Sequence, residues 1–506
     1  MIAFLMAVGT SSYFITFLFD KYNRMPVITS LSPTPAKISE FPFPAVTVCN
    51  MNVMRRSEAE NIFYAAENNL YSEAEIDEKL VYDFCNRDPP KRVAEKTINI
   101  SAPWDYIQKF MINISQPCHE MFMYCEWHGD RVECTDFFNP SLTDEGICCV
   151  FNRLKRDFIF KNPRDLSDLN ITFPGESYDW TPERGYQSNI SFDVLPRRAR
   201  GPGTHMGLTI VINAELDEYF CATDNSQGFK IMLNNPTETP KISSFAISVE
   251  AGKETKLVIE PKLTTASDQM RGIDKSKRQC YFETERQLFF YRTYSQNGCN
   301  LECEANFTIR RCGCVLYHMP KNASTRICGK KDDKCIKDAK SKPEILEQSD
   351  DETSESNRVN RIHQCDCLPA CNEITYGFAL SSSRITDAVK IDRSMLGRYN
   401  QSYFKQNMAI IRFYFMEKQY PATIRGVLFG FTEFLSNTGG LLGLFLGFSF
   451  LSAVEIAYFL TFRVCFENRK TRQAEIDVEK VENRKAIRLD ITDPAFIIRK
   501  PLPFRK

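Results

Sequence analysis

The sequence predicts an α+β membrane protein in which two transmembrane helices flank a large, disulfide-rich extracellular domain with a β-sheet core. Three observations predict this fold class. The chain has an uncharged run of 21 residues at 434–454 and a second apolar run at 1–19. Of its 19 cysteines, 18 lie between Cys49 and Cys371, in the long segment that separates the two runs.

The run at 434–454 predicts the second span, because its length matches the hydrocarbon thickness of a bilayer at about 1.5 Å rise per helical residue. We expect this transmembrane segment to cover 434–462. On a helix the small residues of the run share one face about 100° wide. They are Ser436, Gly439, Gly440, Gly443 and Gly447. Such a stripe lets helices pack closely in lipid, and around a symmetry axis it leaves room for water and ions. Both interpretations stay open from this pattern.

The run at 1–19 predicts the first span, since these mostly apolar residues precede the first charges, at Asp20 and Lys21. A cleaved signal peptide is the alternative. The run has no basic n-region, however, and it is longer than a typical apolar h-region. Because a helix at 1–19 has no cytoplasmic residues before it, we expect the amino terminus of the chain to be incomplete.

The sidedness follows from sequons and from charge. Seven N-x-S/T sequons lie between the two spans, at Asn99, Asn113, Asn170, Asn189, Asn306, Asn322 and Asn400. The segment 463–506 holds 12 Lys/Arg and 7 Asp/Glu, so the positive-inside rule predicts a cytoplasmic tail. We therefore expect an extracellular domain at 20–433, both termini in the cytoplasm, and insertion in the plasma membrane. The balance of 64 basic and 64 acidic residues argues against a nucleic-acid partner.

The even number of cysteines between the spans predicts an oxidising compartment and up to nine disulfides. A zinc site is the alternative, since paired cysteines also bind metal. The sequons and the C-x-C spacing at Cys312 and Cys365 favour disulfides. We expect neither a metal ion nor a cofactor. Cys465 alone lies on the expected cytoplasmic side.

Within 20–433 we expect one folded unit with a β core. Ser57-x-x-Glu60 has the capping-box pattern, and apolar residues at helical spacing follow it, which predicts a helix at 58–71. A polar, acidic stretch at 341–361 is expected to form a mobile loop. Alternating or β-branched apolar segments predict strands at 205–216, 228–233, 245–249, 256–259 and 408–415.

Several motifs carry a family resemblance. The cysteine-rich part reads Tyr294-Ser-Gln-Asn-Gly-Cys299-Asn-Leu-Glu-Cys303, then Cys312-Gly-Cys314-x3-His318-Met-Pro320, then Cys365-Asp-Cys367-x3-Cys371. Phe43-Pro-Ala-Val-Thr-Val-Cys49-Asn follows the first span, and Gly146-Ile-Cys148-Cys-Val-Phe-Asn152 comes later. With the glycine stripe and its Gly-x-Ser, these motifs resemble the degenerin, epithelial sodium channel and acid-sensing ion channel family nearly end to end. The segments 443–452 and 278–282 are most similar to its insect pickpocket branch.

The resemblance implies a hand-like extracellular domain with finger and palm regions and a thumb at about 280–371. It also implies disulfide pairs: Cys280–Cys371, Cys299–Cys367, Cys303–Cys365, Cys312–Cys335, Cys314–Cys328, Cys49–Cys148 and Cys125–Cys134. We expect the remaining extracellular cysteines to form two further bridges, with pairing left open. They are Cys85, Cys118, Cys149 and Cys221.

The function that the resemblance implies is a trimeric, voltage-insensitive, amiloride-sensitive sodium channel that is gated through its extracellular domain. Its expected partners are sodium ions, membrane lipid, related subunits in a homo- or heterotrimer, and an extracellular ligand or matrix. The alternative is a non-conducting accessory subunit or a two-span receptor. No catalytic motif is present, so we do not expect an enzyme. The sequence does not indicate the gating stimulus.

For the pore, the resemblance assigns Gly447, Phe448 and Ser449 to the selectivity filter. It assigns Ser436 to the position at which bulky side chains hold family members open. Phe448 replaces a commoner small residue, so a preference for Na⁺ over K⁺ does not follow. On a straight helix Ser449 would point about 160° away from the centre of the stripe. A Gly-x-Ser filter therefore requires the helix to break at Phe448 and Ser449.

Two acidic residues flank the uncharged run. Glu433 and Glu455 would each form a ring of three carboxylates in a trimer, attractive to cations. Glu433 has the alternative of an ordinary exposed residue at the membrane interface. Glu455 is harder to explain in that way, because an acid near the end of a span needs water or a partner. We therefore expect Glu455 to line the pore with Gly439, Gly440 and Gly443.

Two further sites carry weaker signals. Tyr22 matches a tyrosine that contacts a tryptophan at the thumb base in the family, but Lys277 stands at the tryptophan position. An interfacial aromatic anchor is therefore the alternative for Tyr22. Arg197-Arg-Ala-Arg200 fits the R-x-x-R pattern of secretory convertases, and an uncleaved basic loop is the interpretation that we favour.

Overall fold

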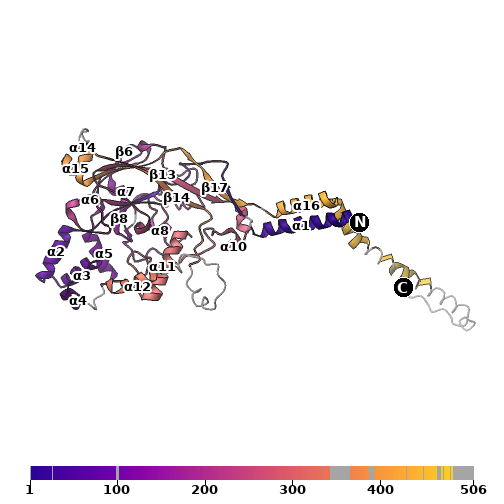
Figure 1. Cartoon of the computed structure of the whole chain (residues 1–506), viewed down its shortest axis with the longest axis horizontal. Helices are drawn as coiled ribbons and strands as arrows, with labels where there is room; N and C mark the ends of the chain where they lie inside the picture. The colour runs from indigo at the N-terminus through magenta and orange to yellow at the C-terminus, as the bar shows by residue number, and fades with distance from the viewer. Residues whose placement is uncertain are drawn as a thin grey trace, which may run out of the picture. The chain divides into compact units, whose positions relative to one another are not determined.

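The computed structural model describes residues 2–24, 27–97, 102–171, 173–341, 365–386, 393–428, 430–447, 449–463, 466, 469–470, 472–478 and 480–481. The chain divides into two compact units. The disulfide domain is Val27–Val427, and the helical unit consists of Met1–Pro26 and Leu428–Lys506. Figure 1 labels the helices and strands of both units.

The disulfide domain is built on a mixed sheet of eight strands in its described residues. The order is β1-β17-β13-β15-β9-β5-β6, and β14 pairs with the other edge of β13. The bounds are β1 Val27–Leu31, β5 Phe122–Trp127, β6 Asp130–Val132, β9 Leu208–Asn213, β13 Lys253–Ala266, β14 Glu373–Arg384, β15 Met408–Phe415 and β17 Ala422–Val427. β15 is buried over most of its length, since it lies between β13 and β9 with both faces covered. This explains its almost continuous apolar sequence.

The longest strand, β13, organises this sheet. Leu257 and Ile259 are buried, while Lys256 before them and Glu260 after them are exposed, as expected for side chains that alternate between two faces. Along one edge β13 pairs in parallel first with β15 and then with β17. Pro261 lies between these two pairings, where the ladder changes partner and a missing N–H is tolerated.

A second sheet has five described strands in the order β12-β11-β3-β8-β7. Its bounds are β3 Ala45–Asn50, β7 Phe138–Thr143, β8 Gly146–Phe151, β11 Phe229–Asn234 and β12 Ile247–Val249. Two short pairs complete the strands, formed by β2 Ala36–Lys37 with β16 Gln419–Tyr420 and β4 Asn52–Arg55 with β10 Tyr219–Ala222. One hydrophobic core joins the two larger sheets. Phe43 is at its centre, with its ring 5.0 Å from that of Trp127 and 5.5 Å from that of Phe415.

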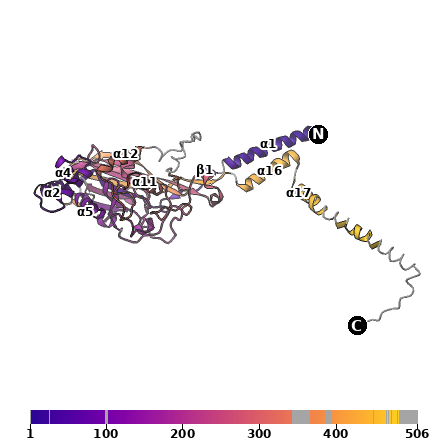
Figure 2. The same cartoon turned by 90° about the horizontal axis from the view of Figure 1, so that it is seen from below.

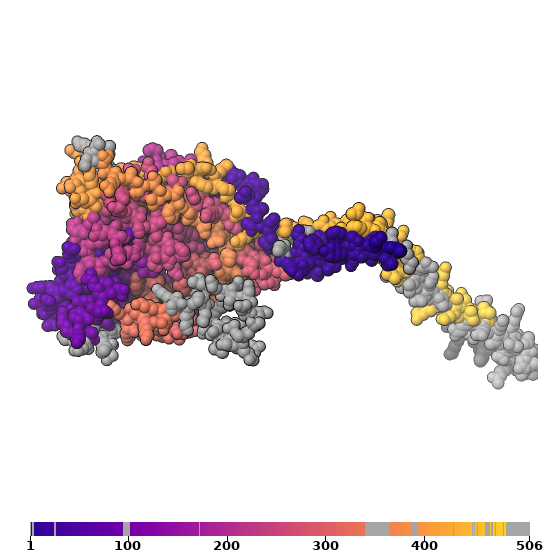
Figure 3. All heavy atoms as spheres, viewed as in Figure 1, coloured from indigo at the N-terminus to yellow at the C-terminus, as the bar shows by residue number. Residues whose placement is uncertain are grey.

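Helices cover the sheets and extend from them. Their bounds are α2 Arg56–Glu67, α3 Ala74–Phe84, α4 Lys91–Thr97, α5 Trp104–Ile114, α6 Cys118–Met121, α7 Cys134–Phe137, α8 Arg156–Ile159, α9 Ile242–Phe245, α10 Lys275–Arg278, α11 Gln296–Cys312, α12 Asp333–Ser341, α14 Arg393–Leu396 and α15 Gln401–Asn407. Short 3-10 turns are η1 Thr204–Met206, η2 Leu216–Glu218, η3 Asp268–Gly272 and η4 Lys330–Asp332. A second core joins α2, α3 and α5 to the loop that follows α11. In Figure 3 the purple part of the chain that holds α2, α3 and α5 lies next to the salmon-coloured part around α12.

Most of the expected elements are present. The predicted strands correspond to β9, β11, β12, β13 and β15, although Phe245 belongs to α9 and β13 is much longer than expected. The predicted helix at 58–71 is α2, but its capping box is wrong. Arg55 is the N-cap residue, and the Ser57 N–H donates to the Glu218 carboxylate at 2.9 Å, so a distant acid caps this helix. The predicted loop at 341–361 lies outside the described residues beyond Ser341.

The helical unit contains α1 Ile2–Arg24, α16 Phe431–Leu446, α17 Phe450–Ala457 and the π-helix η7 Tyr458–Arg463. The segment 434–462, expected as one span, is thus divided among three helical pieces. Among the described residues, no helix combines the length and the apolar character that a membrane crossing requires.

Candidate functional site

The two longest helices of the helical unit, α1 and α16, pack side by side (Figure 2). The less exposed residues of α1 recur at helical spacing, at Ala7, Ser11, Ile15, Leu18 and Tyr22. Aromatic contacts join the two helices at both ends. Phe14 stacks on Phe445 with ring centroids 6.1 Å apart, and Tyr22 lies 5.6 Å from Phe434. These contacts make α1 and α16 antiparallel neighbours.

The small-residue stripe of α16 lies on its opposite face. The α16 residues that are partly buried are Phe434, Thr438, Leu441, Leu442, Phe445 and Leu446. At about 100° per residue, the stripe from Ser436 to Gly443 is centred roughly 150° from this face. All four stripe residues of α16 are exposed. A Cβ atom added at Gly439 or Gly440 would meet no atom within 4 Å. In the described chain, the stripe is therefore uncovered and accessible to another helix or to water.

The uncharged run at 434–454 breaks into two helices at the Gly-x-Ser motif, where a filter made of these residues requires a break. α16 ends at Leu446, and Gly447 follows in the left-handed conformation, with φ 63° and its N–H donating to the Gly443 carbonyl. Glycine adopts this conformation without the Cβ penalty of other residues. Ser449 then caps α17, because its Oγ accepts a hydrogen bond from the Ser452 N–H at 3.3 Å. Phe448 lies outside the described residues.

The Gly-x-Ser motif also predicts the helix break from its residue types alone, independently of the angles around the stripe. Glycine after a helix and serine before the next helix are the ordinary signals of a C-terminus and an N-cap. Gly447 as a C-cap and Ser449 as an N-cap predict two helices with one residue between the two caps. The sequence contained this second signal for the break.

The acids at the two ends of the run are exposed in the described chain. Glu433 lies in the first turn of α16, where the positive end of the helix dipole favours a carboxylate. Glu455 lies on α17, beyond the break. The two acids therefore belong to different helices, and the Gly447–Ser449 segment separates them.

In the described residues of the disulfide domain, 18 cysteines form nine disulfides. Seven of them have the pairs that the resemblance implies. The two bridges whose pairing was open are Cys85–Cys221 and Cys118–Cys149. Cys465 lies outside the described residues.

Helix α11 lies in the cysteine-rich segment 280–371, which the resemblance implies to be the thumb. Cys299 and Cys303 lie one turn apart on the same face and bond Cys367 and Cys365 respectively. The carboxylate of Glu302, between them, is buried and accepts three backbone N–H groups at 2.7, 2.6 and 3.1 Å. Three charge-assisted hydrogen bonds satisfy this buried acid. Each bridge can stabilise the folded segment by roughly 2–4 kcal/mol.

The base of the thumb packs against the first and last strands of the disulfide domain. The Cys280–Cys371 bridge, Met270 and Phe282 form a small buried cluster with Val27 and Val427 at its edge. Val27 on β1 is also paired in register with Val427 on β17. The chain continues from these two strands toward α1 and α16. Sequence reasoning missed this contact, because a single valine at a strand end carries no recognisable signal.

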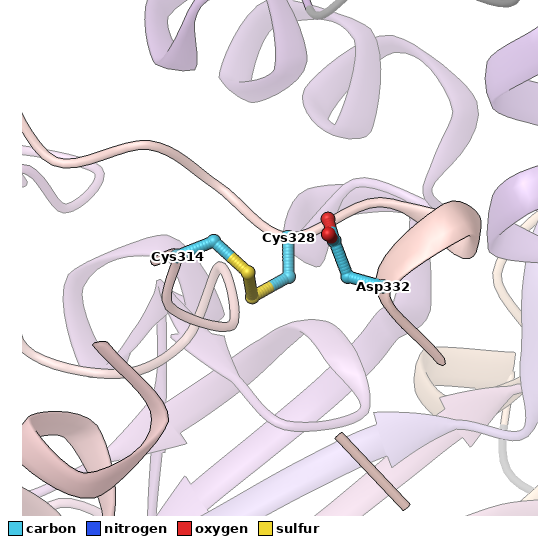
Figure 4. A group of neighbouring side chains, drawn as sticks. All are labelled: Cys314, Cys328 and Asp332. Carbon is cyan, nitrogen blue, oxygen red and sulfur yellow. A yellow bond between two sulfur atoms is a disulfide. The ribbon is translucent and has the colours of Figure 1, made fainter. Parts of the chain in front are cut away.

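One group of side chains has the composition of a metal site. Cys314, Cys328 and Asp332 lie together, as Figure 4 shows. The two sulfur atoms form a disulfide and are not thiolates, and thiolate is the form that binds zinc. Asp332 receives hydrogen bonds from Arg326 at 2.9 and 3.0 Å. The geometry of this group therefore supports a structural role.

The R-x-x-R segment at 197–200 is a loop whose central residues are packed. Arg198 is only 7% exposed and Ala199 only 1% exposed. The Arg198 guanidinium lies over the rings of Tyr186 and Phe192 and donates to the carbonyl of Ser39 at 2.9 Å. The segment 197–200 is therefore a basic loop, as favoured from the sequence, but one whose middle is packed: Arg197 and Arg198 take aromatic and backbone partners, and the exposed Arg200 pairs with Asp193. A folded chain does not present this segment to a protease.

The sequons agree with an accessible surface. The described asparagines Asn113, Asn170, Asn189, Asn306, Asn322 and Asn400 are all exposed. Asn99 lies outside the described residues. Glycan attachment at the described positions requires no rearrangement of the core.

Comparison with known proteins identifies the family. A family model described as amiloride-sensitive sodium channel matches residues 1–459. Pickpocket protein 28 of Drosophila melanogaster is 36% identical over 484 residues, which cover 93% of this chain and 75% of that protein. Sodium channel protein Nach of Drosophila melanogaster is 23% identical over 472 residues, covering 88% of this chain and 78% of that protein. Acid-sensing ion channel 4 of Homo sapiens is 23% identical over 466 residues, covering 90% and 72% respectively. The chain therefore belongs to the amiloride-sensitive sodium channel family, which is a family of ion channels and not of enzymes.

Proposed function

We propose that this chain is a subunit of a voltage-insensitive, amiloride-sensitive cation channel of the plasma membrane. Three subunits surround the pore, and the disulfide domain controls its opening from outside the cell. The observation that carries this proposal is the uncovered stripe of α16, which ends at the left-handed Gly447. A helix with one face packed on α1 and a bare face opposite is suited to a symmetric pore.

In the proposed pore, Ser436, Gly439, Gly440 and Gly443 line the axis. The break at 447–449 interrupts the helix, which leaves backbone carbonyls without helical partners and able to contact ions. The permitted place for such irregular backbone in a membrane is a water-filled cavity. Rings of Glu433 and Glu455 raise the local concentration of cations on the two sides of the filter.

In the proposed topology, residues 1–19 and 434–462 cross the membrane and 20–433 is extracellular. The segment 463–506 and the amino terminus are cytoplasmic. The basic composition of 463–506 and the exposed sequons support this orientation. The bound partners are sodium ions, lipid and related subunits in a homo- or heterotrimer. An extracellular ligand or matrix component acts on the disulfide domain.

The test is electrical recording from oocytes that express the full chain. We expect an inward sodium current that amiloride blocks and that shows no voltage-dependent gating. Ser436→Val should increase the constitutive current, since a larger side chain on the axis prevents the closed packing. Leu435→Val is the matched control, because Leu435 is 58% exposed and lies outside the stripe. It should leave the current unchanged.

The outcomes separate the two candidate roles. If both Ser436→Val and the parent chain reach the cell surface without any current, the homomeric channel is contradicted, and the chain is then a subunit of a heteromer or has the accessory-subunit or receptor role. If Leu435→Val activates as strongly as Ser436→Val, the stripe does not line the pore. Permeability ratios for Na⁺ and K⁺ measured on the same cells decide the selectivity that Phe448 leaves open.

A further inference from the structure

A small cavity in the disulfide domain has an unusual excess of positive charge. Its volume is about 60 Å³, enough for a few water-sized molecules, since one water needs about 10–15 Å³. Strand β7, residues between Arg153 and Phe173 and the loop that ends at Lys321 form most of its lining, with Thr239 and Tyr291 beside them. The charged side chains of the lining are Arg153, Arg156, Asp168 and Lys321, with His318 beside them.

Lys321 is the most unusual of these residues, because only 2% of its surface is exposed. Its Nζ atom donates to the Tyr317 carbonyl and lies 4.0 Å from the centre of the Trp104 ring. An ammonium group has three N–H donors, so these contacts leave donor capacity unused at a residue that lines the cavity. No carboxylate of the described chain forms an ion pair with Lys321. Burial lowers the pKa of Lys321 to about 7, as expected for an uncompensated cation.

Arg153 is the second uncompensated cation. It donates to the hydroxyl of Ser141 at 2.8 Å and, weakly, to that of Thr239 at 3.5 Å. Its Nε atom is enclosed and has no hydrogen-bond partner in the described part of the chain. No described carboxylate pairs with it either, and burial lowers its pKa. A guanidinium has five N–H donors, so the two side-chain contacts of Arg153 leave donors unused.

The single acid of the lining does not neutralise these two cations. Asp168 accepts two hydrogen bonds from the Arg156 guanidinium, at 3.0 and 2.7 Å. Arg156 also donates to the Asn170 side chain and the Pro163 carbonyl, so both partners of this ion pair are occupied. Asp168 also acts on Lys321 and Arg153 through its charge but forms an ion pair only with Arg156, so the cavity has three basic side chains against one acid. Buried charges are normally paired, so the arrangement lacks an anion.

We propose that this cavity binds one small monovalent anion, a halide or an oxyanion of similar size, between Lys321 and Arg153. The bound anion would connect the loop that carries Lys321 with Arg153, two residues after the end of β8. Chloride is the simplest occupant outside the cell by charge and size. The site lies wholly inside the disulfide domain and does not depend on the proposed pore.

The first experiment uses the purified full chain in detergent and replaces sodium gluconate with sodium chloride at constant ionic strength. The thermal unfolding midpoint should rise with chloride and then saturate, because a ligand that binds only the folded state stabilises it. Lys321→Met should reduce the apparent chloride affinity at least tenfold. Lys109→Met is the matched control, since Lys109 is exposed on α5, the helix that carries Trp104. It should keep the parent response.

A second measurement makes the proposal independent of how the variants fold. Crystals of the parent protein grown in sodium bromide should give an anomalous peak in the cavity, between the side chains of Lys321 and Arg153. Water or empty density there, with bromide present at high concentration, overturns the proposal. A chloride-dependent midpoint that Lys321→Met leaves unchanged also overturns it, because the anion would then act elsewhere on the protein.

Discussion

The ring of Tyr22 lies 5.6 Å from the ring of Phe434, with the two planes tilted by 36°. This contact joins the end of α1 to the start of α16 within the helical unit. In the family, the resemblance implies, the matching tyrosine contacts a tryptophan at the thumb base. In this chain Lys277 stands at the tryptophan position. In this chain the described ring partner of Tyr22 is on the neighbouring helix. The aromatic contact therefore fixes the two helices to each other.

We predict that Tyr22 and Phe434 are energetically coupled. In a double-mutant cycle with Tyr22→Ala and Phe434→Ala, the coupling should be about 0.5–1.5 kcal/mol, as for other aromatic pairs. The measurement is the free energy of unfolding of the full chain in micelles. Tyr13→Ala is the control partner, because Tyr13 contacts Phe14 and is 69% exposed. It should be additive with Phe434→Ala within about 0.5 kcal/mol. If the effects of Tyr22→Ala and Phe434→Ala are also additive, the contact between these two rings does not contribute to stability.

We predict that Gly447→Ala disturbs ion selectivity. Gly447 has φ 63°, and an alanine in this left-handed region costs roughly 1–2 kcal/mol. The strain should favour a straighter helix through the filter. The current carried by Na⁺ should therefore fall relative to that carried by K⁺ in bi-ionic recordings. Leu444→Ala, on an exposed helical position one turn earlier, should keep the parent ratio. If Gly447→Ala leaves the ratio of Na⁺ to K⁺ current unchanged, the break at Gly447 does not determine ion selectivity.

We predict a pH-dependent stability that originates at Glu238. Burial, with a smaller effect of the nearby Glu373 carboxylate, raises the pKa of Glu238 from 4.5 to about 8. Between these two pH values the folded chain keeps a proton that the unfolded chain has released. The contribution to the free energy of unfolding is therefore present below pH 4.5. It falls as the pH rises toward 8, with a slope of up to about 1.4 kcal/mol per pH unit.

Glu238→Gln should remove this slope, because glutamine does not titrate. Glu417→Gln is the control, since Glu417 is exposed and has no described ion pair. The measurement is denaturant unfolding of the full chain at several pH values between 5 and 8. Equal slopes in the parent and in Glu238→Gln would contradict the burial of this carboxyl group.

We predict that secretory convertases do not cut the folded chain after Arg200. Arg198 and Ala199 are buried, and a protease needs an extended, accessible segment. Incubation of the native protein with a purified convertase should leave a single band on a gel. The same chain, denatured before incubation, should be cut, because the R-x-x-R sequence is then accessible. A cleaved native protein would show that this segment opens readily.

Part of the site could be read from the sequence because its signals are local. The glycine spacing of α16 gave the bare face, and its angle to Ser449 gave the break. The helical spacing of Cys299 and Cys303 and the alternation along β13 are equally short-range patterns. The capping box at Ser57 failed for the opposite reason. Glu218, distant along the chain, supplies the carboxylate that caps α2.

The sequence by itself determined the family, the position of the stripe and the extent of the cysteine-rich domain. These properties depend on residue type and spacing over a few turns or a single motif. The tertiary structure alone decided the Cys85–Cys221 bridge, the burial of Arg198, the contact of Val27 with the thumb base, and the cationic cavity at Lys321. Each of them joins segments far apart in the sequence; the Cys85–Cys221 pair, for example, is separated by 136 residues. Such contacts depend on how whole sheets and helices pack, and local patterns carry no record of that packing.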